Sequence, residues 1–90
     1  MAGKAAMSKA RPHLAIEILS PTDRRRKAVE KCRQWVATGA SMAVLVDPDR
    51  RTATVFTADG ERELRGDDAL TLGDLIPGLA IPLRDVFTDG

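Results

Sequence analysis

Residues 13–19 alternate between the two sides of an extended chain, and this run limits the folds open to the sequence. One face holds Leu14, Ile16 and Ile18, and the other holds Ala15, Glu17 and Leu19. A carboxylate among apolar neighbours is unfavourable unless a cation, a metal ion or a hydrogen-bond donor pairs with it. The run therefore predicts a half-buried strand and a partner for Glu17.

A helical pattern follows this strand. Its predicted buried stripe, with a spacing of about 3.6 residues, is Ala28, Val29, Cys32, Trp35 and Val36. Ser20 or Thr22 is the predicted cap, with Asp23 in the first turn. Gly39 is the expected stop at the other end.

The second half of the chain is predicted to form short strands. Residues 42–46 form an almost continuous apolar run, which is typical of a strand covered on both faces. Strands are also expected over 52–57 and, as a charged edge strand, over 61–65, with a last helical turn within 81–87 covering the core. A strand, a helix and a strand in this order indicate a right-handed parallel crossover, followed here by a meander. We therefore predict an α/β fold: a small mixed sheet with one main helix on one face.

Composition excludes several classes of protein. Ninety residues make one small domain, and only three of them are aromatic, which argues against a base-stacking platform for single-stranded nucleic acid. The single cysteine, Cys32, precludes an intrachain disulfide and favours a reducing cytoplasm. No segment reads as a signal peptide or a membrane span, so a membrane partner is not expected. We divide the chain into a flexible basic tail over 1–11 and a domain over 12–90.

Glu17 and Lys31 form the sharpest candidate site. Strand carboxylates that bind a divalent cation, beside a lysine that stabilises charge on a phosphate, are the parts of metal-dependent phosphodiester cleavage. Lys31 lies about 100° from the centre of the apolar stripe on the helical wheel, so its side chain can reach along the helix flank to the sheet. A structural ion pair, or two solvated charges, explains the same residues.

Arg24, Arg25, Arg26 and Lys27 are the second candidate, as a phosphate-binding group for DNA. Cations at a helix N-terminus are disfavoured by the helix dipole, and a nearby anion offsets this. The alternative is a solvated charged face.

Other polar residues are expected to be structural. We predict that His13 starts a strand and that Ser20 is a cap. The pairs Asp47/Asp49 and Asp67/Asp68 fall in predicted turns.

Several spaced blocks resemble the Uma-two family, restriction-endonuclease-like proteins of the PD-(D/E)XK nuclease superfamily. The matching blocks are Pro12-x-Leu14-x-Ile16-Glu17-Ile18-Leu19-Ser20-Pro21-Thr22-Asp23-Arg24-Arg25, Glu30-Lys31, Trp35, Gly39, Val46-Asp47-Pro48, Leu75-Ile76-Pro77-Gly78-Leu79, Leu83 and Phe87. The resemblance covers about residues 12–88 and the C-terminal half of a typical member. It implies a truncated restriction-endonuclease-like core that cleaves DNA with Mg²⁺.

The resemblance also assigns roles to residues. Glu17 matches the second acid of the family signature and is implied as catalytic and as a metal ligand, and Lys31 matches the catalytic lysine on the helix. Leu19 stands where the superfamily signature expects a lysine. The first acid, which belongs to a Pro-Asp pair on an earlier strand, has no counterpart because no Asp or Glu precedes Glu17.

Three hypotheses about function follow. In the first, the chain is an endonuclease-like domain, inactive alone, that receives the missing acid from another chain. In the second, it is a non-catalytic dimerising or DNA-binding module, and in the third a structural subunit without nucleic acid. We expect a homodimer or a complementary chain to cover the edge of the 13–19 strand.

Overall fold

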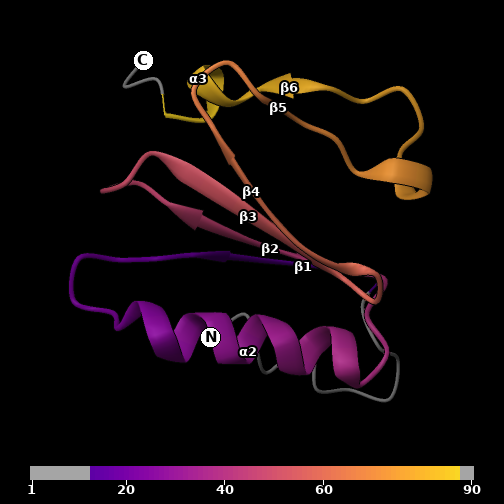
Figure 1. The fold of residues 1–90 in the computed structure, drawn as a ribbon, viewed down its shortest axis with the longest axis horizontal. Helices are drawn as coiled ribbons and strands as arrows, with labels where there is room; N and C mark the ends of the chain where they lie inside the picture. The colour runs from indigo at the N-terminus through magenta and orange to yellow at the C-terminus, as the bar shows by residue number, and fades with distance from the viewer. Residues whose placement is uncertain (1–12, 88–90) are drawn as a thin grey trace.

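The computed structural model describes residues 13–87, which fold around one four-stranded mixed sheet (Figure 1). Its elements in chain order are β1 (Leu14–Ile18), α2 (Arg25–Ala37), β2 (Met42–Asp47), β3 (Thr52–Thr57) and β4 (Gly60–Arg65). The strand order is β1-β2-β3-β4, with β1 parallel to β2 and the other two pairings antiparallel. The predicted crossover and meander are confirmed. The predicted tail over 1–11 lies outside the described residues.

The chain after β4 forms a smaller unit on the sheet. Strands β5 (Ala69–Leu70) and β6 (Ile81–Pro82) pair antiparallel, with the short helix η1 (Gly73–Leu75) between them. Helix α3 (Leu83–Val86) follows directly and is the helical turn expected within 81–87. Helix α2 covers one face of the sheet, while β5, β6 and α3 lie over the opposite face (Figure 1).

Strand β2 is the centre of both cores. Val44 and Val46 belong to the cluster beneath β5, β6 and α3, together with the buried Leu83. Ala43 and Leu45 point the other way, into the cluster beneath α2. All residues of β2 after Met42 are buried, which confirms the prediction of a strand covered on both faces.

Helix α2 packs on the sheet through the predicted stripe. Cys32 is fully buried against Leu45 and Phe56, with Trp35 and Val36 at its side. Burial, and then the charge of Glu17, raise the pKa of the Cys32 thiol to about 11. The thiol is therefore a protonated core group at neutral pH.

The predicted start of this helix is wrong. The helix begins at Arg25, and its N-cap, Arg24, makes no side-chain capping bond. The expected caps bond within their own turn: Asp23 Oδ2 accepts from the Ser20 amide at 2.9 Å, and the Ser20 and Thr22 hydroxyls lie 3.3 Å apart. This turn precedes the helix instead of opening it.

The end of the helix agrees with the sequence. Helix α2 ends at Ala37, and Gly39 adopts a φ of 125°, which side chains disfavour. None of the helices within residues 13–87 is long and apolar enough to cross a membrane.

The two-sided burial of β2 makes its side chains sensitive to truncation. Replacing Leu45, which is fully buried, with alanine is expected to lower the free energy of unfolding by about 2–5 kcal/mol, because it removes apolar contacts and leaves a cavity. The control is Ile76→Ala, since Ile76 is 47% exposed and its truncation should have an effect below about 1 kcal/mol. Urea denaturation followed by circular dichroism measures both; equal losses would contradict the assigned core.

Candidate functional site

Glu17 and Lys31 meet on the α2 face of the sheet. Glu17 lies in the middle of β1, in register with Leu45 of β2, and Lys31 lies near the middle of α2. Lys31 Nζ is 3.3 Å from Glu17 Oε2, so the predicted reach of the lysine along the helix flank is correct. The side chain of Lys31 is 52% exposed and that of Glu17 is 30% exposed, so both remain accessible to a ligand.

Strand β1 has a free edge beside this pair. Within residues 13–87 it pairs with β2 alone. The Leu19 amide donates to the Val46 carbonyl at 2.8 Å, and the His13 carbonyl accepts from the Met42 amide at 3.1 Å. Because backbone groups alternate in direction along a strand, those of Ile16 and Ile18 face away from β2, toward the open edge.

The side chains of Ile16 and Ile18 add an apolar surface to this edge. They are 53% and 66% exposed and lie on the face opposite Glu17. Together with Val46 and Phe87 they line a shallow groove beneath α3. A free strand edge with exposed isoleucines is a typical pairing site for another chain segment.

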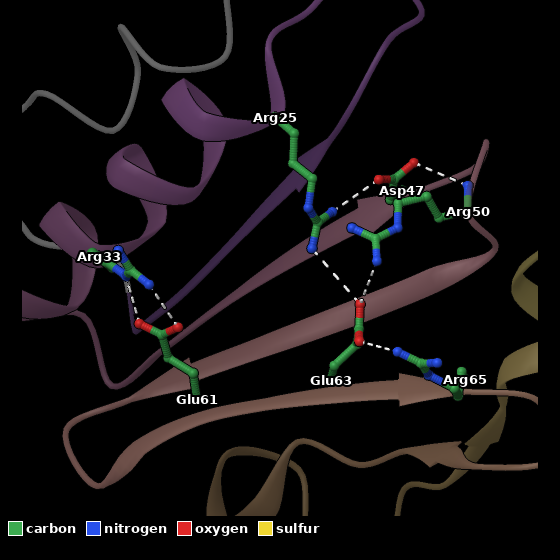
Figure 2. A network of polar contacts seen from close by, with 7 residues as sticks. All are labelled: Arg25, Arg33, Asp47, Arg50, Glu61, Glu63 and Arg65. Carbon is green, nitrogen blue, oxygen red and sulfur yellow. Dashed lines mark hydrogen bonds and ion pairs between the residues drawn. The ribbon is translucent and has the colours of Figure 1, made fainter.

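The basic run, residues 24–27, contains two kinds of residue. Arg24, Arg26 and Lys27 are exposed, and their side chains make no hydrogen bond or ion pair with another described residue. Arg25 turns toward the sheet, where its Nη1 donates to Asp47 Oδ2 at 2.8 Å (Figure 2). Of the four predicted DNA-binding residues, only these three exposed ones are therefore directed wholly to solvent.

Asp47 ties the start of α2 to the end of β2. Its side chain is 3% exposed, and besides Arg25 it accepts from the Arg50 amide at 3.2 Å, closing the turn before β3. The structural role predicted for Asp47 is confirmed. Its bond to Arg25 was not predictable, because it joins residues 22 positions apart.

A second group of ion pairs, absent from the predictions, joins α2 to β4. Arg33 donates to both carboxylate oxygens of Glu61, Nε at 2.5 Å and Nη2 at 3.0 Å (Figure 2). This bond lowers the pKa of Glu61. Glu63 on the same face of β4 contacts three arginines, Arg25, Arg50 and Arg65. The alternation of charges over residues 61–65 is the one sequence signal that marks this cluster.

Two further residues of the sequence analysis, His13 and Asp68, make hydrogen bonds that join or close turns. The carbonyl of His13 accepts from the amides of Ser41 and Met42, and its ring makes no hydrogen bond or ion pair with a described residue. Asp68 Oδ2 accepts from the Arg65 amide at 3.0 Å, in the turn after β4.

A complete metal site is not present in the described part of the chain. Within residues 13–87, no three carboxylate, histidine or cysteine side chains come together in a way that could hold an ion. Glu17 is a single carboxylate with an ammonium group beside it, whereas Mg²⁺ usually takes one or two carboxylates together with substrate oxygens. The described residues therefore do not form a magnesium site by themselves.

Comparison with known proteins confirms the resemblance. The family model Uma2, described as "Putative restriction endonuclease", matches residues 4–84. A search of curated proteins gives no significant match. Among solved structures, the chain is similar to "a putative nuclease belonging to DUF820 from Anabaena variabilis ATCC 29413", with a TM-score of 0.76 and 25% identity over 83% of this chain. The chain spans 43% of that structure's length, and the α/β fold class is confirmed.

The contact between Arg25 and Asp47 should be the most stabilising ion pair in this region. Asp47→Ala is expected to lower the free energy of unfolding by about 2–3 kcal/mol, because it removes two hydrogen bonds to a buried carboxylate and leaves Arg25 without its short contact. Glu61→Ala breaks an exposed pair and should change it by less than about 1 kcal/mol. Urea denaturation of both variants provides the measurement, and a larger loss in Glu61→Ala would refute this ranking.

Proposed function

This chain belongs to the Uma2 family of restriction-endonuclease-like proteins, and from that premise we propose that it is the lysine-bearing part of a DNA-cleaving nuclease. The contact between Glu17 and Lys31 is the observation that carries the proposal. A carboxylate and an ammonium group on adjacent elements, both open to solvent, provide a cation-binding oxygen and a group that neutralises charge on a phosphate. The domain assigned to this function is residues 12–90.

The roles we assign follow the chemistry of each side chain. Glu17 is the carboxylate of the site and one ligand for a divalent cation, which we take to be Mg²⁺ since its ligands are oxygens. Lys31 binds the phosphate that is attacked, because its ammonium group can donate to non-bridging oxygens. Since residues 13–87 place no second acid beside Glu17, that acid comes from a segment that covers the free edge of β1.

A second copy or a complementary chain is the proposed source of this acid. Pairing along Ile16 and Ile18 would satisfy the outward backbone groups and bury two exposed isoleucines. The cytoplasm is the proposed location, because a single buried cysteine needs no oxidising compartment.

A non-catalytic DNA-binding or dimerising module is the alternative function. Arg24, Arg26 and Lys27 favour it, because they leave three cations exposed at one end of α2. Such a group binds the DNA backbone without reading its sequence.

Nicking of supercoiled plasmid DNA in Mg²⁺ tests the catalytic proposal. It is measured from nanomolar to tens of micromolar protein, so that self-association can cover the β1 edge, and again in the presence of any polypeptide that is found to be encoded directly upstream. We expect nicking that is reduced at least about 100-fold in Glu17→Gln and in Lys31→Ala, since each removes a charge from the reacting site.

Glu30→Gln is the matched control for this experiment. Glu30 is an exposed neighbour of Lys31 on α2, and its neutralisation should leave the nicking rate within about twofold. Plasmid that stays supercoiled under every condition would reject catalysis. Equal loss in the control variant would reject the assigned residues.

DNA affinity tests the exposed cations separately. Replacing Arg24, Arg26 and Lys27 with alanine should weaken binding to duplex DNA and reduce the slope of log K against log salt by about 0.9 for each lost phosphate contact. Arg62→Ala is the control, since the side chain of Arg62 on β4 lies on the face of the sheet that is turned away from α2. Fluorescence anisotropy over a salt series measures both. An unchanged slope in the triple variant would exclude these residues from the interface.

A further inference from the structure

Glu63 is surrounded by three arginines from three different elements (Figure 2). Arg25 opens α2, Arg50 lies in the turn between β2 and β3, and Arg65 ends β4. Arg65 Nη2 bonds to Glu63 Oε1. The Nη2 atoms of Arg25 and Arg50 lie 3.8 Å and 3.7 Å from the other oxygen, Oε2.

The cluster holds more positive charge than its carboxylates balance. Asp47 is the second carboxylate, and its oxygens are occupied by Arg25 Nη1 and by the Arg50 backbone amide. Three guanidinium groups thus face two carboxylates, which leaves a surplus of one positive charge. The hydrogen bond from Arg65 is the first cause, and the other arginines a further cause, of the lowered pKa of Glu63, which is therefore ionised at neutral pH.

Glu63 also leaves donors of this cluster unsatisfied. Distances of 3.7 Å and 3.8 Å exceed the length of an N–H···O hydrogen bond, so two guanidinium groups attract Oε2 without bonding to it. The register places Thr54 opposite Glu63 and Thr52 opposite Arg65 on the same face. The hydroxyls of both threonines are buried and have no hydrogen-bond partner among the described residues.

The arrangement matches a phosphate better than a carboxylate. A phosphodiester carries one negative charge and two non-bridging oxygens, and guanidinium groups bind it through paired donors. The side chains of Arg50 and Arg65 are 51% and 65% exposed, so a nucleic-acid backbone can reach them. A phosphodiester that replaces Glu63 brings the same single negative charge, so the charge balance of the cluster is kept.

We propose that Arg25, Arg50 and Arg65 form a DNA phosphate site in which Glu63 takes the place of the phosphate when DNA is absent. On binding, the Glu63 side chain turns to solvent and the phosphodiester accepts hydrogen bonds from the released guanidinium groups. The proposal rests on the proposed function for the choice of DNA as the ligand. It adds Arg50 and Arg65, which are distant in sequence from the basic run, to the DNA-binding surface.

Neutralising Glu63 distinguishes this role from a purely structural one. If Glu63 competes with phosphate, Glu63→Gln should tighten binding to a random duplex oligonucleotide by about tenfold, because the competing anion is gone. The salt dependence of binding should also steepen, because the phosphate then displaces solution ions at these arginines instead of Glu63. A structural Glu63 would give weaker binding or no change.

Glu61→Gln is the matched control. Glu61 lies two residues away on the same face of β4, has the same charge and also binds an arginine, but only Arg33. The same change in net charge at this position should alter affinity less than threefold, since it frees one guanidinium group instead of three. Equal tightening in Glu61→Gln and Glu63→Gln would overturn the proposal, because net charge alone would then explain both.

Arginine variants keep the proposal testable even if Glu63→Gln unfolds. Arg50→Ala and Arg65→Ala should each weaken DNA binding about fivefold or more in the otherwise unchanged protein, whereas Arg62→Ala, on the other face of β4, should not. Equal losses in all three would overturn the proposal. Because these experiments measure binding, they test the phosphate site even if the protein does not nick DNA. Conversely, a Glu17→Gln variant that binds DNA normally but does not nick it bears only on the proposed function.

Discussion

The burial of β2 on both faces is the constraint on which the other features of this structure depend. Its alternating side chains hold α2 on one side and the small β5–β6 unit on the other, so each layer takes its position from the same strand. Glu17 is placed by its register with Leu45, and Asp47 by its position at the end of the strand. A slip of one residue in the pairing of β1 with β2 would turn Glu17 away from Lys31 and expose it on the opposite face. The candidate site therefore exists only because this pairing is fixed.

Helix α2 is held at the sheet by charges on both of its flanks as well as by its apolar stripe. Lys31 contacts Glu17 on β1, while Arg25 and Arg33 contact Asp47 of β2 and the acids of β4. Exposed ion pairs stabilise a protein only weakly, so the stripe centred on Cys32 provides most of the packing energy. The rotation of the helix about its axis is therefore set mainly by this stripe. That rotation directs Lys31 to the β1 edge and Arg25 to the cluster around Glu63, on opposite sides of one helix.

The sequence predicted those parts of the fold that depend on local pattern. Burial can be predicted directly from the period of two in β1, the apolar run of β2 and the apolar stripe of α2. The position of Lys31 on the flank of the helix then follows from the stripe. The helix start was mispredicted because Asp23 and Ser20 satisfy each other within a turn, an outcome that residue types alone do not distinguish from capping. The arginine cluster was missed for a different reason. Arg25, Arg50 and Glu63 are brought together by the register of β3 with β4 and by the crossover, and neither is encoded in a short stretch of sequence.

Within residues 13–87, the uncovered edge of β1 and the single carboxylate of Glu17 are two aspects of one physical situation. Any segment that pairs with the outward backbone groups of Ile16 and Ile18 comes to lie about 4.8 Å from β1, the spacing of neighbouring strands. Its side chains on the α2 face would then adjoin Glu17 and Lys31, while those on the other face would cover the isoleucines. A segment that covers the apolar surface would thus also place side chains beside Glu17, because both are set by one strand pairing. In the proposed nuclease, the second acid and the cover of the two isoleucines would therefore come from the same segment.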